Sequence, residues 1–284
     1  MKVTLWGTRG SLATPGPDTA RYGGNTSSVA VQGPEGTVLA LDAGTGIRPL
    51  GGALPRTLRR VDVLLTHLHM DHIQGLGFFA PLYHPGMEVH IWGPASTTLN
   101  LRGRLIRYLS PPLFPVHLRD LPCKLFTHEV PCGDFDIGEF RVSSWLVCHP
   151  GPTVGYRVAT SRASMAYLPD HEPALGLRKL SYARDWTSGY AVAEGVDLLI
   201  HDAQYTSDEY KTRVGWGHST FDQAFAFAAL AGVKHFVPFH HDPAHSDSVL
   251  DQLLASAIAA ARPPFPVTPG AEGATFNLDG QAPA

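Results

Sequence analysis

A short histidine-rich segment, His67-Leu68-His69-Met70-Asp71-His72, places four potential metal ligands within six residues. It follows an apolar run at 61–66, which predicts a buried strand. In an extended chain His67 and His69 point to the same side, and Asp71 and His72 then enter the next turn. The first pair could hold one metal ion and the second pair another. A ligand set of nitrogen and carboxylate groups suits Zn²⁺ above all, with Mn²⁺ or Fe as alternatives.

The remaining composition excludes several other kinds of protein. The three cysteines, Cys123, Cys132 and Cys148, form no Cys-x-x-Cys pair, so neither a disulfide framework nor a thiolate zinc cage is expected. Hydrophobic residues make up 44% of the 284 positions and charged residues 17%, a globular rather than a disordered composition. The start of the chain lacks the apolar core of a signal peptide, and the longest apolar run, 224–233, is too short to span a membrane. We therefore expect a cytoplasmic protein with no membrane partner.

The histidines must be positioned by the strands and helices that the apolar pattern predicts. Three near-continuous apolar runs predict strands covered on both faces: 61–66, 196–200 and 233–239. Each run is followed by a histidine, namely His67, His201 and His240. Two hairpins are also predicted, 28–32 with 37–42 and 153–159 with 163–168, and two helices, 220–231 and 248–261. Strands in both halves with helices between them predict two sheets packed face to face and covered by helices.

The signature His67-x-His69-x-Asp71-His72 resembles that of the metallo-β-lactamase superfamily, and the likeness extends over nearly the whole chain. Four shorter segments are similar to the branch that contains ribonuclease Z and the small cyclic phosphodiesterases: Gly7-Thr8-Arg9-Gly10-Ser11, Gly24-Asn25-Thr26-Ser27-Ser28, Leu41-Asp42-Ala43-Gly44-Thr45-Gly46 and Gly217-His218-Ser219-Thr220. The resemblance implies a mixed α/β fold, a four-layer αββα sandwich, and no linker divides the chain, so residues 1–284 are expected to form a single domain. A proline-rich stretch at 110–122 predicts a lid or a rigid connector, inside an insertion around 101–128.

The resemblance also implies a full set of ligands for two metal ions. One ion would be bound by His67, His69 and His149, the other by Asp71, His72 and His240, and Asp170 would be shared by both. His149 follows a strand predicted at 141–148 and matches the third histidine of the family.

Two of these assignments depend on the neighbouring residues. Asp170 matches the bridging aspartate of the family, although Pro169 and His171 replace the small residues that usually surround it. His240 is preferred to the adjacent His241 as the last ligand because it directly ends the strand at 233–239.

The chemistry implied by such a centre is hydrolysis. Two ions about 3.5–4 Å apart lower the pKa of a bridging water and hold the hydroxide for in-line attack on a phosphodiester. The segments His201-Asp202-Ala203 and His218-Ser219-Thr220 resemble paired motifs of the ribonuclease Z branch, in which the histidine protonates the leaving oxygen and the acidic residue orients it. The predicted catalytic residues are therefore His218 as general acid, Asp202 as its partner, and Asp71. The alternative for Asp202 and His218 is a turn residue and a neighbour of a helix cap.

The net charge of the chain and the short interval between His149 and Asp170 indicate which class of substrate to expect. Lys and Arg number 22 against 25 Asp and Glu, so at a formal charge of −3 the chain lacks the overall positive field that favours long nucleic acids. Ribonuclease Z-like enzymes carry a long arm for transfer RNA between the third histidine and the bridging aspartate, whereas here one predicted hairpin separates His149 from Asp170. We therefore expect a dinuclear metal-dependent phosphodiesterase acting on a small cyclic or diester phosphate, and we do not expect long nucleic acid as its partner. The resemblance also suggests a homodimer.

Two other functions stay open at this point. An RNA-processing endonuclease of the ribonuclease Z type would show salt-sensitive binding of RNA. A non-catalytic metal-binding sensor would keep its ligand binding when His218 is substituted. The superfamily also includes enzymes that cleave lactams, lactones and thioesters, since a fold does not determine its chemistry.

Overall fold

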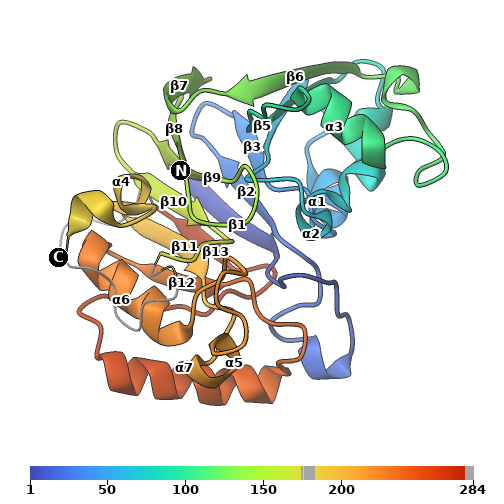
Figure 1. Cartoon of the computed structure of the whole chain (residues 1–284). Helices are drawn as coiled ribbons and strands as arrows, with labels where there is room; N and C mark the ends of the chain where they lie inside the picture. Colours follow the sequence, from blue (N-terminus) through green and yellow to red (C-terminus); the bar gives the residue numbers. More distant parts are fainter. Residues whose placement is uncertain (174, 176–182, 279–284) are drawn as a thin grey trace.

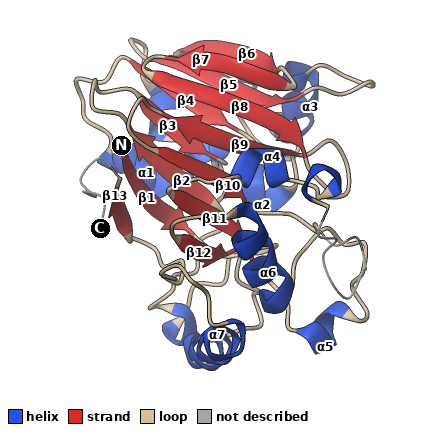
Figure 2. Ribbon diagram, turned by 90° about the vertical axis from the view of Figure 1, so that its left-hand side faces the viewer, coloured by secondary structure: helices blue, strands red, loops and turns tan. Residues whose placement is uncertain are grey.

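Two β-sheets lie face to face in the described part of the chain, residues 1–173, 175 and 183–278 of a computed structural model (Figures 1 and 2). The larger sheet holds seven strands. In spatial order they are β13 (Thr275–Asn277), β1 (Lys2–Gly7), β2 (Ser28–Gln32), β3 (Val38–Leu41), β4 (Arg60–Leu64), β5 (Glu88–Pro94) and β6 (Lys124–Val130). Strands β3 to β6 run parallel, and the other neighbours in this sheet pair antiparallel.

The smaller sheet holds six strands. Their spatial order is β12 (Phe236–Phe239), β11 (Leu198–Asp202), β10 (Ser164–Leu168), β9 (Val154–Ala159), β8 (Phe140–Leu146) and β7 (Gly133–Ile137). Strands β10 to β12 run parallel, whereas β7 to β10 form an antiparallel meander. The predicted hairpin at 153–168 is present as β9 and β10, so it fills most of the interval between His149 and Asp170.

Helices cover the outer face of each sheet, which confirms the four-layer αββα sandwich. The larger sheet is covered by α1 (Ile47–Ala53), α2 (Met70–Ile73) and α3 (Leu101–Tyr108). The smaller sheet is covered by α4 (Tyr190–Ala193) and α6 (Phe221–Ala231), with the short α5 (Ser207–Tyr210) before α6, and α7 (Asp247–Ala261) packs against α6 (Figure 2). A separate apolar cluster fills the space between the two sheets.

The sandwich explains why its central strands are apolar throughout. In β3, Leu39 and Leu41 face the space between the sheets, whereas Val38 and Ala40 face the helices. Alternate residues of a strand point to opposite faces, so a strand covered on both sides needs apolar residues at every position. The three apolar runs predicted as buried strands correspond to β4, β11 and β12, with ends shifted by up to three residues.

The sequence does not predict three strands at one end of the sandwich, β5, β6 and β7. The side chains that β5 and β7 turn toward the other sheet include Trp92 and Phe135, whose rings stack at 5.2 Å. His128 on β6 stacks on Trp92 and hydrogen bonds His90, with nitrogens 2.9 Å apart. Histidine and tryptophan on this face interrupt the apolar pattern on which strand prediction depends.

The predicted insertion around 101–128 contains α3, the stretch 110–122 and the first part of β6. Phe114 packs edge-on against Phe78, with ring centroids 5.7 Å apart, and Leu118 is buried. The stretch 110–122 therefore rests on the helical layer outside the larger sheet, and its role as a lid or connector stays a prediction. Within the part of the chain that the structure describes, no helix combines the length and the apolar character needed to cross a membrane.

One tyrosine hydroxyl ties the sheets together beside the histidine-rich segment. Tyr156 on β9 is buried and donates to the carbonyl of Leu65 at 2.8 Å. We expect Tyr156→Phe to lower the free energy of unfolding by about 1–3 kcal/mol, because the buried carbonyl loses its partner. Urea unfolding measures this loss. Tyr83→Phe is the matched control, since Tyr83 is exposed and donates to the Gly77 carbonyl; equal losses in both variants would contradict the prediction.

Candidate metal centre

The ends of several strands meet at one edge of the sandwich and carry the predicted site residues. Parallel strands bring their carboxyl ends to the same edge of a sheet. His67 follows β4, Asp170 follows β10 and His240 follows β12. The other predicted residues lie beside them: Asp71 and His72 in α2, His69 before it, His149 after β8, Asp202 at the end of β11 and His218 before α6. The seven predicted metal ligands fall into two groups, and within each group the ligand atoms lie within 4.8 Å of one another.

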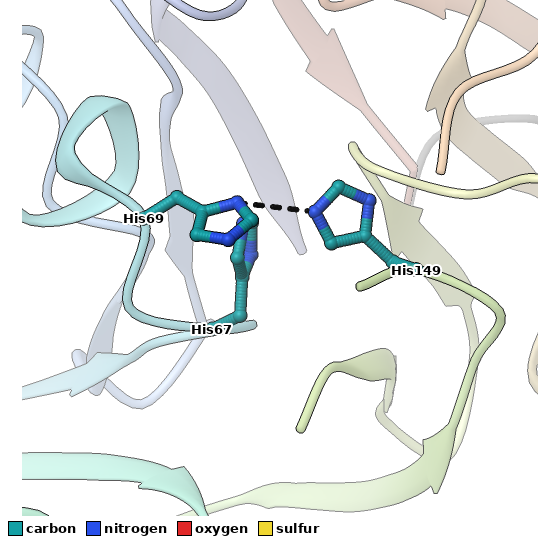
Figure 3. A group of neighbouring side chains, drawn as sticks. All are labelled: His67, His69 and His149. Carbon is teal, nitrogen blue, oxygen red and sulfur yellow. Dashed lines mark hydrogen bonds between the residues drawn. The ribbon is translucent and has the colours of Figure 1, made fainter. Parts of the chain in front are cut away.

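The first group consists of His67, His69 and His149 (Figure 3). Nδ1 of His69 and Nε2 of His149 are 3.2 Å apart, and the ring of His67 lies edge-on to both, with centroid distances of 4.4 and 4.7 Å. His67 and His149 are buried, whereas His69 is exposed. The group is therefore open to solvent on the side of His69.

The second group consists of Asp71, His72, Asp170 and His240, all of them buried. Nε2 of His72 and Nε2 of His240 lie 2.9 and 3.2 Å from Oδ1 of Asp170. The other carboxylate oxygen of Asp170 points toward the first group, 3.8 Å from Nε2 of both His67 and His149. Asp170 thus lies between the two groups, where a bridging ligand is expected.

Hydrogen bonds on the outer side of the rings determine which nitrogen faces the centre. Nδ1 of His72 donates to Oδ2 of Asp42 at 2.7 Å, and Nδ1 of His149 donates to the Gly217 carbonyl at 3.0 Å. Carboxylates and carbonyls only accept, so each Nδ1 carries the proton and each Nε2 keeps its lone pair in the neutral ring. Metal-binding histidines are usually held in this way.

His240 is held in the same way by Gln204, which is not among the predicted site residues. The amide nitrogen of Gln204 donates to Oγ of Ser11 and to Oδ2 of Asp242, at 3.3 and 3.4 Å. Its Oε1 therefore faces Nδ1 of His240, 3.0 Å away, and accepts that proton. Nε2 of His240 is left with a lone pair that faces the two carboxylates of the second group.

These tautomers leave electron pairs facing one another at the centre. Nε2 of His72 and Oδ1 of Asp170 are 2.9 Å apart, yet within the described residues neither atom forms a hydrogen bond, and neither does the buried Nε2 of His67. Electron pairs at this distance repel unless a cation or a proton lies between them. Imidazole nitrogens and carboxylate oxygens without thiolates are ligands for Zn²⁺, Mn²⁺ or Fe. The residues present therefore fit divalent cations.

The pKa shifts of the ligand side chains also suit the binding of divalent cations. Burial lowers the pKa of His67, His69 and His149 because the interior disfavours the charged ring. Histidine binds a metal ion only as the neutral imidazole. At Asp170 burial alone would raise the pKa, but the nearby histidines, His240 foremost, outweigh it and hold the pKa of this carboxyl well below its usual range. The first group thus combines neutral nitrogens with an ionised carboxylate. At His72 burial opposes the charge, but the carboxylates of Asp170 and Asp71 outweigh burial and raise the pKa of the ring, so a divalent cation bound there would take the place of a proton.

Asp202 and His218 form a buried pair beside the two groups. Nδ1 of His218 donates to Oδ2 of Asp202 at 2.7 Å. Burial opposes the charge on this ring, but the carboxylate of Asp202 outweighs burial and raises the pKa of His218 to about 9. The ring stacks on that of His240, with centroids 5.0 Å apart. A protonated imidazole therefore lies next to the second group.

Other histidines of the same segments face away from the centre. Nε2 of His241 donates to the Gly270 carbonyl at 2.7 Å, so the structure places His240 rather than His241 in the second group. Nδ1 of His171 lies 2.8 Å from Nε2 of His201, and both rings are buried. His171, which departs from the family pattern, therefore leaves the centre free.

Two residues that hold the ligands, Asp42 and Gln204, are not among the site residues that the sequence predicts. Asp42 follows β3 and accepts from Thr66, His72 and Tyr167. Its position at the end of a predicted strand is a signal that could reveal it, since polar residues after neighbouring strands meet at one edge. Gln204 offers no such signal, because its amide acquires its role only from partners that are distant in the sequence.

Comparison with known proteins shows relatives and structural neighbours over most of the chain. A ribonuclease Z from Brevibacillus brevis is 28% identical over 272 residues, which cover 80% of this chain and 82% of that protein. The metallo-beta-lactamase fold protein YhfI from Bacillus subtilis matches with a TM-score of 0.70 at 21% identity, over 97% of this chain and 99% of that one. The short form of human tRNase Z matches with a TM-score of 0.68 at 22% identity, over 98% of this chain and 99% of that one. At these identities the two structures show likeness of fold.

The relatives correct one expectation from the sequence. The expectation that long nucleic acid is not a partner is wrong, because a relative that aligns over 80% of the chain is a ribonuclease Z. A formal charge of −3 is a sum over the whole surface and does not describe the field at any one face. The single hairpin between His149 and Asp170 shows only that no long arm lies at that place, not that RNA finds no other surface.

The family follows from a match to most of the chain. A family model described as a beta-lactamase superfamily domain matches residues 37–241, which include both ligand groups and the pair of Asp202 and His218. The two facing sheets, the outer helices and the cluster of histidines and aspartates agree with that match. The chain therefore belongs to the metallo-β-lactamase superfamily and is one of its metal-binding hydrolases.

Proposed function

We propose that this protein is a phosphodiesterase that uses two divalent cations, Zn²⁺ foremost. The observation that carries the proposal is the position of Asp170, whose two carboxylate oxygens face two separate groups of ligands. The name ribonuclease Z of the relative from Brevibacillus brevis supports a phosphodiester as the reacting group. RNA is therefore a substrate to test beside small cyclic and linear phosphodiesters, which contain the same bond.

The chain supplies the ligands and the shape of the site. Two divalent cations, when bound, would lower the pKa of a water molecule that acts as the nucleophile and would neutralise charge on the phosphoryl oxygens. The first ion would be held by His67, His69 and His149 and the second by Asp71, His72 and His240, with Asp170 between them. Because His69 is the exposed member, a phosphate would reach the centre from the side of His69.

His218 is positioned to supply the proton that the leaving oxygen needs. In the protein without bound cations its pKa is raised to about 9, chiefly by Asp202, and Asp202 also holds Nδ1. An alkoxide leaves slowly unless it is protonated, so a general acid contributes most when the leaving group is a ribose oxygen. We therefore assign proton donation to His218 and its orientation to Asp202.

Removal of the metal tests the proposal as a whole. We expect protein loaded with Zn²⁺ or Mn²⁺ to hydrolyse bis(p-nitrophenyl) phosphate and to lose this activity after dialysis against a chelator, because the nucleophile depends on the bound ions. Initial rates of p-nitrophenol release measure the effect, and reloading with the metal is the control. Protein that binds two ions per chain yet hydrolyses neither this diester, nor a cyclic nucleotide, nor RNA would refute the proposal and favour a sensor.

The role of His218 can be separated from metal binding by the choice of leaving group. We expect His218→Ala to lower kcat about 10²–10⁴-fold on RNA or a cyclic nucleotide, whose leaving oxygen needs a proton. The p-nitrophenolate ion leaves without protonation, so the same variant is expected to keep most of its activity on bis(p-nitrophenyl) phosphate. Asp202→Asn is expected to show the same contrast. Equal losses on both kinds of substrate would indicate that His218 holds the centre together instead.

A further inference from the structure

Glu172 is a buried carboxylate that lies outside both ligand groups. It is 1% exposed and follows Asp170 by two residues. Oε1 accepts from the hydroxyl of Tyr210 at 2.5 Å and from the backbone N–H of Gly215 at 3.0 Å. Oε2 accepts from the backbone N–H of Gly217 at 2.9 Å. Three donors from one segment, 210–217, thus converge on this side chain.

The hydrogen bond between Glu172 and Gly217 connects Glu172 to His149 of the first ligand group. The N–H of Gly217 donates to Glu172, and its carbonyl accepts the Nδ1 proton of His149. Gly217 has a φ of +90°, and a Cβ at this position would overlap the ring of His149. The residue must therefore be glycine, and only its neighbours can hold it in place. Glu172 is a neighbour that does so, by accepting from its N–H.

Glu172 also anchors the chain on the other side of His149. Its backbone N–H donates to the carbonyl of Cys148 at 2.9 Å. His149 is thus held from both directions, through the residue that precedes it and through the carbonyl that receives its proton. Gly217 in turn precedes His218, so the same bond sets the start of the segment that carries the proton donor.

Glu172 is suited to this task because it only accepts. A buried carboxylate needs several donors, and a backbone amide that faces it is oriented by a charge-assisted hydrogen bond. Replacing the carboxylate by an amide would turn one of its two oxygens into an NH₂ group. That group cannot accept from an N–H. Oε1 has two donors and Oε2 has one, so the amide keeps more hydrogen bonds with its oxygen at the position of Oε1, and Gly217 then loses its partner.

We propose that Glu172 is a positioning residue that holds Gly217 so that His149 presents Nε2 to the first metal ion. The inference rests on the proposed metal centre and adds to it a dependence of the first ion on the segment 210–217. Groups that orient a metal-binding histidine commonly contribute about 10- to 100-fold to metal affinity. Glu172 is expected to act on the first ion and not on the second, since among the described residues its side chain forms no hydrogen bond with Asp71, His72 or His240.

The test measures Zn²⁺ affinity at each group separately, by competition with a chromophoric chelator. In a His240→Ala background, which leaves the first group intact, Glu172→Gln is expected to weaken Zn²⁺ binding about 10- to 100-fold. In a His67→Ala background, which leaves the second group intact, the same change is expected to have no effect. Equal weakening of both groups would show a merely structural role, and no weakening of either would also overturn the inference.

Tyr210→Phe is the matched control. It removes one donor from Oε1 but leaves the bonds to Gly215 and Gly217, so Zn²⁺ affinity is expected to stay unchanged even if urea unfolding shows lower stability. If Glu172→Gln does not fold, Glu172→Asp keeps the charge on a shorter side chain and is expected to weaken the first group alone. If the unsubstituted protein binds no Zn²⁺, the proposed metal centre itself is refuted. This result differs from a loss of Zn²⁺ affinity in the Glu172 variants, which bears only on the role of Glu172.

Discussion

The carboxylate of Asp42 joins the two sheets at the edge where the histidines gather, and the geometry of the centre depends on it. It accepts from the backbone N–H and the hydroxyl of Thr66 after β4, from Nδ1 of His72 in α2 and from the hydroxyl of Tyr167 on β10. A carboxylate without solvent contact is tolerated only when such donors satisfy it. Because these donors come from both sheets, they converge only when the sheets have packed. The orientation of His72 is therefore a property of the whole sandwich rather than of the short segment that contains it.

Much of the architecture can be predicted from the sequence because it depends on local patterns. Strands covered on both faces are apolar throughout, and the ligands must follow such strands, as His67 and His240 do. The density of ligands at 67–72 indicates a metal site without further context. His149 and Asp170 differ, since His149 stands alone after β8 and Asp170 is followed by two polar residues, His171 and Glu172, that lie outside both ligand groups. Only the resemblance to a family distinguishes them from ordinary turn residues.

What the sequence does not reveal are roles that arise from distant backbone groups. In the sequence Glu172 is one acidic residue in a loop, and its three donors come from 210–217, which follow α4 and β11 along the chain. The role of Gln204 cannot be predicted from the sequence either, because its amide orients His240 only when the folded chain brings Asp242 and His240 within hydrogen-bond distance of it. The wrong expectation about nucleic acid has a related origin. Net charge is a property of composition, whereas recognition depends on where the charges lie on the folded surface.

The exposure of His69, against the burial of the other ligands, gives the centre one open side. A substrate, a departing product and an exchanging ion would all pass through the same opening. While a substrate or product occupies this opening, the ion held by His69 would dissociate more slowly, because its path to solvent is blocked. Such a protein would lose its metal more slowly during turnover than at rest, and its metal content would come to reflect the supply of substrate as well as the supply of zinc.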